Sequence, residues 1–395
     1  MIYFDNAATT IIDSKVLEAM LPFLKSNYGN ASSIYSLAQE SRREIEIARK
    51  KIAEYLNCES REIFFTSGGT ESDNWATKSA AWCNKSKGKH IITSCIEHHA
   101  ILHSCRSLEK QGFRVSYIGV DRFGIINLDE LEKAICEETI LISIMFANNE
   151  IGTIQPIEEI GKIARSKNII FHTDAVQAIG NIYIDVNKFN IDMLSMSAHK
   201  FHGPKGIGAL YINKNVKIKS FMDGGAQELN LRAGTENTAA IVGMGKAIEI
   251  AKSELNNKTD FLINMRNKLI EKILKNINYV RLNGHSVQRL VNNVNFSFEF
   301  IEGESLLLLL DSKGFCVSSG SACTSGSLDP SHVLLSLGLS HELAHGSLRI
   351  TLSKYNKESE IDLFIQELPD IIKKLREMSP LYEDFINGKI KSEIF

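Results

Sequence analysis

Short apolar runs alternate with amphipathic segments along roughly the first 250 residues of the chain. Each run has the length of a buried strand, and the segments between them have helical periodicity. Residues 42–56, for example, place Ile45, Ile52 and Tyr55 on one helical face. The predicted strands are residues 63–66, 89–94, 114–119, 140–146, 169–173 and 193–197. This alternation predicts an α/β fold, with a mostly parallel sheet covered by helices on both faces.

The pattern changes near residue 259. Leu262, Met265 and Leu269 mark a long helix, and we interpret its start as the crossover between two domains. Strand-like stretches at 291–300 and 347–353, with a closing helix near 361–375, then predict a smaller α+β domain. We expect a large domain over residues 15–258, and a small domain formed by residues 1–14 and 259–395.

Composition and charge exclude several classes of protein. The chain has 395 residues, of which 44% are hydrophobic and 23% charged, as in an ordinary globular enzyme. Its formal net charge of −2 predicts no attraction to nucleic acid or to an anionic membrane. Apolar runs such as residues 306–310 are far too short to span a bilayer. The first residues, MIYFDNAATT, have no basic residue and no long apolar stretch, so we expect no secretory signal and a cytoplasmic location.

The seven cysteines are scattered and form no C-x-x-C pair. An odd number at irregular spacing argues against a disulfide framework and against a structural zinc site. We therefore expect a reducing compartment and no fixed metal site.

Two charged residues follow the carboxyl ends of consecutive predicted strands. Ligands bind at these ends in doubly wound sheets. Asp174 lies in HTDAVQ, and Lys200 ends SAHK. Taken alone, Asp174 fits a helix cap about equally well, and a lone surface lysine is far commoner than a reactive one. Together they favour pyridoxal phosphate, which needs a Schiff-base lysine and a carboxylate that keeps its ring nitrogen protonated.

A phosphate group also needs an anion-binding turn, and residues 68–70 supply a candidate. Glycines let the backbone approach an anion closely, and the helix that follows offers N–H groups at its N-terminus. On its own, the motif GGT is weak evidence for a phosphate site. It is also not the G-x-G-x-x-G motif of a dinucleotide site. Ser197 and His199, beside Lys200, can add side-chain donors.

Three further segments place polar side chains near strand ends. His98, in IEHHA, can stack on a flat ring and move a proton, although a solvent-exposed histidine at a helix start is the plainer interpretation and fits His99 better. Asn149 follows the strand predicted at 140–146, where a buried amide needs a polar partner. Thr235 lies in a glycine-rich polar loop, from which its hydroxyl can donate to a phosphate.

The stretch SSGSACTSGS is the most informative of the chain. A free cysteine is usually buried as a small hydrophobic residue, which we expect for Cys58, Cys136 and Cys316. Cys323 instead stands among serines and glycines, which predicts a nucleophile in a mobile, exposed loop at about residues 318–331. Arg349, in the apolar LRITLS, needs a carboxylate partner from the protein or from a substrate.

These motifs together resemble the NifS/IscS-type cysteine desulfurases of the class V aminotransferase family, which have the fold-type I architecture of pyridoxal phosphate enzymes. The resemblance covers nearly the whole chain, and HTDAVQ, SAHK and SSGSACTS are its most specific parts. The other matching segments are YFDNAATT, TSGGTESDN, EHHA, NNEIG, RAGTEN and LRITLS, in family order. RAGTEN and the cysteine loop look more like NifS than like housekeeping IscS.

The resemblance implies roles for individual residues. Lys200 would form the Schiff base, Asp174 would pair with the ring nitrogen, and His98 would stack on the ring and act in acid–base steps. Cys323 would accept the sulfur as a persulfide. The implied cofactor contacts are Gln177 and Asn149 near the phenolic oxygen, and Gly69, Thr70, Ser197, His199 and, from the second subunit of a homodimer, Thr235 at the phosphate. Arg349, with Asn149, would bind the substrate carboxylate.

The implied reaction converts L-cysteine into L-alanine and a persulfide on Cys323. The resemblance also implies transfer of that sulfur to an iron–sulfur scaffold protein of the IscU/NifU type, with Cys323 as a transient cluster ligand. Two alternatives stay open, a selenocysteine lyase and another transaminase of the same fold, because both share the cofactor residues without depending on Cys323. A non-catalytic scaffold is disfavoured, since each expected catalytic position holds the expected residue.

Overall fold

The computed structural model describes residues 1–319 and 330–394. Its largest sheet has seven strands in the order β2-β8-β7-β6-β5-β3-β4. All neighbours are parallel except those of β8, which runs antiparallel to β2 and β7. The mostly parallel sheet expected from the sequence is therefore confirmed. Its strands are β2 (Ile63–Thr66), β3 (His90–Ser94), β4 (Arg114–Ile118), β5 (Thr139–Ser143), β6 (Ile170–Asp174), β7 (Met193–Ser197) and β8 (Gly208–Ile212).

Helices cover both faces of this sheet. Successive residues of a strand point to opposite sides, so neighbouring apolar residues pack against helices on opposite faces. In β3, Ile92 packs into the core formed with α2, α6 and α8, whereas Ile91 packs with α3 and α4. Burial on both faces explains why the strands appear in the sequence as continuous apolar runs. The helices of this part are α1 (Ser14–Lys25), α2 (Ser36–Leu56), α3 (Gly69–Asn84), α4 (His99–Glu109), α5 (Leu128–Ala134), α6 (Ile157–Ser166), α7 (Gln227–Asn230) and α8 (Thr238–Asn276).

The C-terminal part has its own core around a three-stranded antiparallel sheet, β12-β10-β9. Phe296, Ile350 and Phe364 belong to this core. Its elements are β9 (Val280–Leu282), β10 (Asn293–Phe298), α9 (Gly303–Ser312), β11 (Phe315–Cys316), α10 (His332–Ser336), α11 (His341–His345), β12 (Ser347–Thr351), α12 (Glu358–Glu377) and α13 (Pro380–Ile386). Within the described ranges, no helix is long and apolar enough to cross a membrane.

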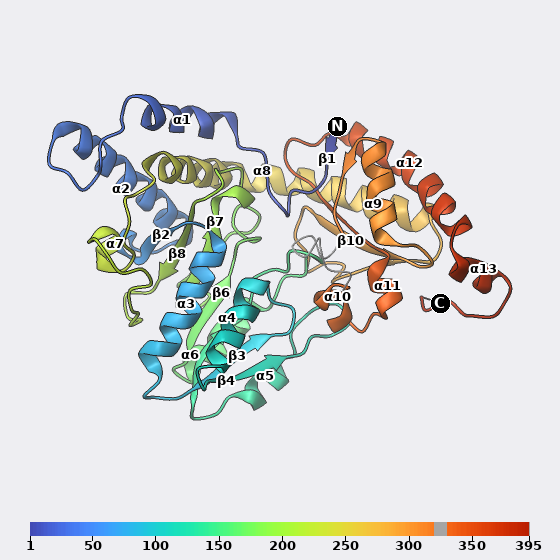
Figure 1. Cartoon of the computed structure of the whole chain (residues 1–395), viewed down its shortest axis with the longest axis horizontal. Helices are drawn as coiled ribbons and strands as arrows, with labels where there is room; N and C mark the ends of the chain where they lie inside the picture. The colour runs from blue at the N-terminus through green and yellow to red at the C-terminus, as the bar shows by residue number, and fades with distance from the viewer. Residues whose placement is uncertain (320–329, 395) are drawn as a thin grey trace.

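The long helix α8 connects the two parts, as Figure 1 shows. It begins at Thr238, where the Asn237 side chain accepts a hydrogen bond from the Ala240 N–H. Ile241 packs into the core of the large sheet, and Leu262 packs into the C-terminal core. The expectation that the helix starts at the crossover is therefore wrong, because nothing between its two amphipathic halves breaks the helix. The proposed boundary at residues 258/259 falls inside α8 and stays a prediction.

The first residues of the chain contact both parts. The strand β1 (Ile2–Tyr3) pairs in parallel with β11. A few residues later, the Thr10 N–H donates to the His199 carbonyl at 2.9 Å, and the Asp13 N–H donates to the His202 carbonyl at 3.0 Å. This segment thus passes the carboxyl end of β7, where the candidate site lies.

Substituting Gly208 should damage this end of the sheet. A Cβ at Gly208 would lie 2.5 Å from the Met196 carbonyl oxygen and 2.7 Å from Cα of Gly68, so backbone atoms must move. We expect G208A to lower the free energy of unfolding by about 1–3 kcal/mol. Thermal melts would measure the loss. The matched control is G119A, whose Cβ would meet only the end of the Glu130 side chain at 3.4 Å, and equal losses in the two variants would contradict this account.

Candidate active site

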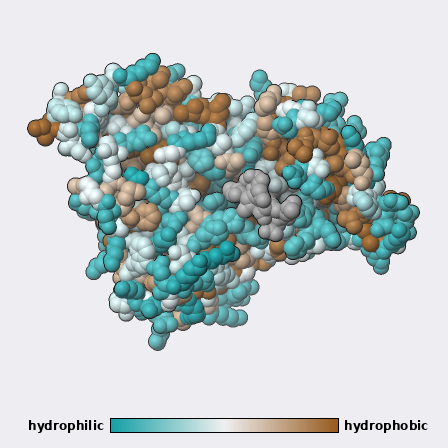
Figure 2. Space-filling model, in the orientation of Figure 1, coloured by the Kyte–Doolittle hydropathy of each residue, from teal (hydrophilic) through white to brown (hydrophobic). Residues whose placement is uncertain are grey.

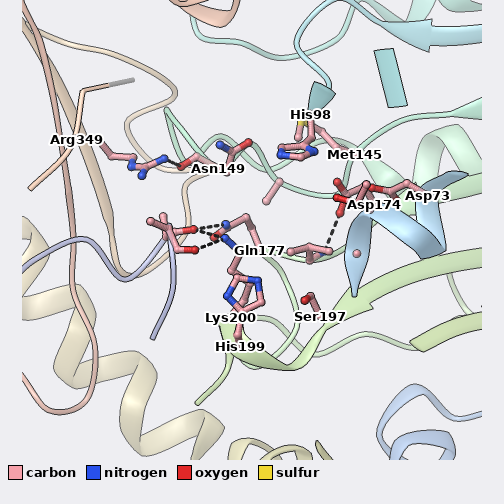
Figure 3. A pocket seen from close by; sticks show the side chains of 16 residues that line it. Asp73, His98, Met145, Asn149, Asp174, Gln177, Ser197, His199, Lys200 and Arg349 are labelled. Atoms are coloured by element: carbon pink, nitrogen blue, oxygen red, sulfur yellow. Dashed lines mark hydrogen bonds between the residues drawn. The ribbon is translucent and has the colours of Figure 1, made fainter. Parts of the chain in front are cut away.

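A cavity of about 200 Å³ opens at the carboxyl ends of β6 and β7. This is where ligands bind in doubly wound sheets. Figure 3 shows His98 on one side of it and Lys200 with His199 on the opposite side. The lining residues are Ala7, Ala8, Gly69, Thr70, Asp73, His98, Met145, Ala147, Asn149, Asp174, Val176, Gln177, Ser197, His199, Lys200 and Arg349. Segments from the two ends of the chain and from its middle therefore meet at one cavity.

Lys200 ends the short 3-10 helix η2 (Ala198–Lys200), directly after β7. Its amine donates hydrogen bonds to the carbonyl oxygens of Ala7, at 2.6 Å, and Ala8, at 2.7 Å. The Gln177 amide donates to the same Ala7 carbonyl at 3.0 Å. A charged amine and a neutral amine can both donate to these two acceptors, so the backbone can hold Lys200 in either state.

Asp174 is buried at the end of β6, where its side chain accepts a hydrogen bond from the Val176 N–H at 2.9 Å. Burial raises the pKa of Asp174 to about 6, and the nearby charge of Lys200 opposes this rise. His172, on the same strand, supplies no positive charge. Its ring nitrogens each lie 2.9 Å from a serine hydroxyl, of Ser143 and of Ser195, and burial lowers its pKa to about 3. A cationic group entering the cavity would therefore find its counter-charge at Asp174.

His98 caps the N-terminus of α4, with its Nδ1 accepting a hydrogen bond from the Ala100 N–H at 3.1 Å. Burial and the charge of Lys200 lower the pKa of His98 to about 4. The neutral ring consequently carries its proton on Nε2. His98 lines the cavity, so the plainer interpretation as a solvent-exposed histidine is wrong for it. His99 points elsewhere and packs against His103 and His332, at ring-centroid distances of 5.1 and 4.9 Å.

An anion-binding corner lies beside Lys200, at the first turn of α3. Backbone N–H groups there have no partner within the helix, and the helix dipole favours negative charge. A Cβ at Gly69 would lie 2.7 Å from the Val176 side chain, so a larger residue would narrow this corner. Ser197 and His199 line it from the end of β7, and the exposed Lys205 adds a positive charge at its opening.

Arg349 lies on β12 and is only 2% exposed. Its Nη2 donates to Oδ1 of Asp5 at 2.8 Å, and its Nη1 donates to the Asn149 carbonyl at 3.3 Å. Its buried Nε has no hydrogen-bond partner among the described residues. The carboxylate partner that the sequence requires is thus present in the protein, and a donor is left over for a ligand.

The residues present fit the pyridoxal phosphate that the resemblance implies. Lys200 is held by two carbonyls, Asp174 is a buried acid, and His98 is a neutral ring that faces the cavity. The first turn of α3 offers donors to a phosphate, and Arg349 offers one to a carboxylate. Across residues 1–319 and 330–394, no group of three or more His, Cys, Asp or Glu side chains has the arrangement of a metal site.

One predicted site residue lies elsewhere, and another is outside the described residues. Thr235 lines a neighbouring pocket with Ser67 and Gly206, outside the cavity around Lys200. Cys323 lies outside the described residues, as does most of the loop predicted at about 318–331. Every other predicted site residue lines the cavity, which brings together Gly69, Thr70, His98, Asn149, Asp174, Gln177, Ser197, His199, Lys200 and Arg349.

Sequence reasoning missed several residues of this site. Asp5, the partner of Arg349, is 344 residues away from it in the chain, so no local pattern could join them. The carbonyls of Ala7 and Ala8 contribute through the backbone, which side-chain chemistry cannot indicate. Asp73 lies within the TESD segment, where a polar residue in the first turns of a helix is ordinary.

One expectation about the cysteines is wrong. Cys136 is exposed, because it lies in the short connection between α5 and β5. Hydrogen bonding from Thr139 lowers the pKa of the Cys136 thiol, and Arg114 acts in the same direction. Cys58 and Cys316 are partly buried, and burial raises the pKa of both thiols.

Known proteins are similar to this chain in architecture and in sequence. The model of the family described as "Aminotransferase class-V" matches residues 2–364, so the chain belongs to the class-V aminotransferases. Among curated relatives, "Cysteine desulfurase IscS" of Methanosarcina thermophila is 58% identical over 380 residues, 96% of this chain and 94% of that protein. A protein of the same name from Clostridium botulinum is 57% identical over 390 residues, 98% of each chain.

Solved structures give the same grouping. A "NIFS-LIKE PROTEIN" superimposes with a TM-score of 0.89 at 41% identity, covering 95% of this chain and all of that one. "SspA in complex with cysteine" superimposes with a TM-score of 0.80 at 38% identity, covering 90% and 100% of the two chains. Within the family, the chain thus groups with proteins of the NifS/IscS type. The two curated relatives quoted above have the IscS name, which does not support the NifS leaning of the sequence motifs.

The protonation state of His98 can be measured directly. We expect its ring to stay neutral, with the proton on Nε2, from pH 8 down to about pH 5, because burial lowers its pKa to about 4. NMR of ¹⁵N-labelled histidine would report this, with the signal assigned by its loss in H98Q. A ring that titrates near the ordinary histidine value of about 6.5 would contradict the geometry.

Proposed function

We propose that this protein is a pyridoxal phosphate-dependent cysteine desulfurase, which removes sulfur from L-cysteine and leaves L-alanine and a persulfide on Cys323. The observation that carries the proposal is the meeting of Lys200, Asp174, His98 and Arg349 at one cavity. The names of the relatives point the same way. A selenocysteine lyase or another transaminase of the same fold would not depend on Cys323. The role of this thiol therefore distinguishes a cysteine desulfurase from these alternatives.

The cofactor would be held at both of its ends. Lys200 would bind it covalently, Asp174 would face its ring nitrogen, and His98 would stack on its ring. Gln177 and Asn149 would contact its phenolic oxygen, while the phosphate contacts would come from Gly69, Thr70, Ser197, His199 and, across the subunit boundary, Thr235. When bound, the cofactor supplies an electron sink for the substrate carbon atoms.

The residues of the chain would bind the substrate and move its protons. Arg349 would hold the substrate carboxylate through guanidinium N–H donors that the protein leaves unused, with Asp5 keeping the guanidinium oriented. Once released from the cofactor, the Lys200 amine would take the proton from Cα, since the Ala7 and Ala8 carbonyls keep it at the cavity wall. The neutral His98 could donate a hydrogen bond from Nε2 to a reacting group, and its Nδ1 would have to leave the Ala100 N–H before it could accept a proton.

Sulfur transfer would balance through Cys323. Its thiolate attacks the substrate sulfur, so that an S–S bond forms while the Cβ–S bond breaks and the electron pair passes to the substrate carbon. The proton lost by the Cys323 thiol replaces the sulfur at Cβ, which completes L-alanine. The persulfide would then pass to an iron–sulfur scaffold protein of the IscU/NifU type, with Cys323 as a transient cluster ligand. Because Cys323 must be a free thiol to accept the sulfur, we propose that the protein works in a reducing, cytoplasmic setting.

A homodimer is part of this proposal. Figure 2 shows apolar side chains gathered over α1, at the upper left of the molecule. Exposed apolar residues in and around α1 are Ile11, Leu17, Leu21, Leu24, Tyr28, Ile34 and Tyr35, of which Ile34 is 90% exposed. Contiguous apolar surface of this kind is typical of a protein interface, and a symmetric dimer is the commonest soluble oligomer.

The segment around Thr235 is already fixed within its own chain. Arg49 forms a two-bond pair with Glu228, at 2.7 and 2.8 Å, and Arg232 forms one with Glu71, at 2.8 and 3.1 Å. Glu228 adopts a left-handed backbone conformation, with φ of 44°, as do the two residues after it. Strained backbone persists where surrounding contacts impose it, often at functional sites. This supports a preformed segment that presents Thr235 to a second subunit.

The role of Cys323 is tested by C323S. We expect C323S to bind cofactor and L-cysteine, because their contacts are intact, yet to form no persulfide and to lose alanine production by at least about 100-fold. Mass spectrometry of the protein and an alanine assay would measure the two losses. The matched control is C136S, which removes an exposed thiol of lowered pKa that is not part of the cavity lining, and this variant should react normally. Normal desulfuration by C323S would contradict the proposal and favour the alternatives.

Shared sites are tested by mixing two inactive chains. K200A lacks the Schiff-base lysine, and T235E places a negative charge where a phosphate contact is expected. If Thr235 acts across the dimer, an equal, randomly paired mixture should regain about a quarter of wild-type activity, because half of the dimers are hybrid and each hybrid has one intact site. No recovery in a mixture shown to contain hybrids, or a fully active monomer by light scattering, would assign Thr235 to its own chain.

A further inference from the structure

Asp73 is a buried acid in the cavity wall that the proposed reaction does not use. It lies near the start of α3, is 1% exposed and lines the cavity. Its Oδ1 has no hydrogen-bond partner in the described part of the chain, and it lies 3.8 Å from Nε2 of His172. Figure 3 shows Asp73 beside Asp174, on the wall that would face the cofactor ring. The wall therefore holds two acids where the proposed chemistry needs one.

The charges around Asp73 decide which acid is ionised. Burial raises the pKa of Asp73 most, and two neighbouring acids, Asp174 on β6 and Glu97 before α4, raise it further. His172 is neutral, and the charge of Lys200 acts on Asp174. Asp174 receives a backbone hydrogen bond from Val176. Asp73 receives a hydrogen bond from the Ser195 side chain, which favours its charged form but is outweighed by burial, and its Oδ1 receives none. Two acids this close and this deeply buried do not both ionise, so the proton stays on Asp73.

We propose that Asp73 is a positioning residue that remains protonated at neutral pH, so that the wall facing the cofactor ring has a single negative charge, on Asp174. A neutral acid preserves the size and polarity of the wall without competing for the cationic ring nitrogen. The proposal rests on the proposed function only where it names that nitrogen as the partner of Asp174. The protonation of Asp73 is a property of the chain itself.

The stability of D73N as a function of pH tests the proposal. Asparagine matches the protonated acid in shape and is neutral at every pH. In the wild type, the folded state keeps a proton that the unfolded state loses above about pH 4, so folding becomes less favourable as the pH rises. D73N lacks this penalty. We expect equal melting temperatures near pH 4, and an advantage for D73N that grows to about 3 °C or more at pH 8.

The opposite result is equally clear. If Asp73 were ionised and stabilising, D73N would be the less stable protein at pH 8, and the deficit would disappear toward pH 4. A difference that does not change with pH would also overturn the proposal. Both proteins should be melted with and without cofactor, so that the difference reports Asp73 and not cofactor binding.

Infrared spectroscopy gives a second readout that does not depend on stability. With isotope-labelled aspartate, the wild type at pH 7 should show a carboxylic-acid band that is missing from D73N, and a carboxylate band missing from D73N would refute the assignment. The companion variant D174N separates the two hypotheses. An unchanged cofactor absorption spectrum in D174N would reject Asp174 as the partner of the ring, and with it that part of the proposed function, while leaving the protonation of Asp73 to stand on the first two measurements.

Discussion

The burial of Asp174 at the end of β6 is the constraint on which the rest of the site depends. A carboxylate removed from water needs a positive partner, and its pKa of about 6 shows that the protein alone satisfies this need only in part. His172 is neutral and the Lys200 amine is engaged by backbone carbonyls. The cavity wall therefore suits a cationic group, such as the ring nitrogen of the proposed cofactor. The same lack of positive charge in the wall explains why a second acid beside Asp174, Asp73, keeps its proton.

The N-terminal segment brings the two ends of the site together. Its Ala7 carbonyl accepts hydrogen bonds from Lys200 and Gln177, and Asp5 pairs with Arg349 on β12. Three residues of chain, Asp5 to Ala7, thus link the covalent anchor proposed for the cofactor to the arginine proposed for the substrate. The N-terminal segment is also anchored by the pairing of β1 with β11. Any displacement of this segment would therefore move Lys200 and Arg349 at once.

The sequence predicted the elements of the large sheet well, since strands buried on both faces leave continuous apolar runs. It also placed Asp174, Lys200 and His98 at strand ends, where topology makes ligands bind. It could not predict the Asp5–Arg349 pair or the two alanine carbonyls, because these contacts join distant segments or involve only backbone. It misplaced Cys136, since the general tendency of free cysteines to be buried does not reveal that a particular connection is exposed. The start of α8 was missed because residues 252–261, where the helix crosses from one core to the other, add no residue to either apolar core, so the apolar pattern is interrupted although the helix is not.

The most direct test of this account is the protonation of the cofactor ring nitrogen. The enzyme would be reconstituted with pyridoxal phosphate labelled with ¹⁵N in the ring, and its NMR chemical shift recorded at neutral pH in the wild type and in D174N. A nitrogen that is protonated in the wild type and unprotonated in D174N is the result expected from the buried charge of Asp174. An unprotonated nitrogen in the wild type, or one indifferent to the substitution, would contradict the account.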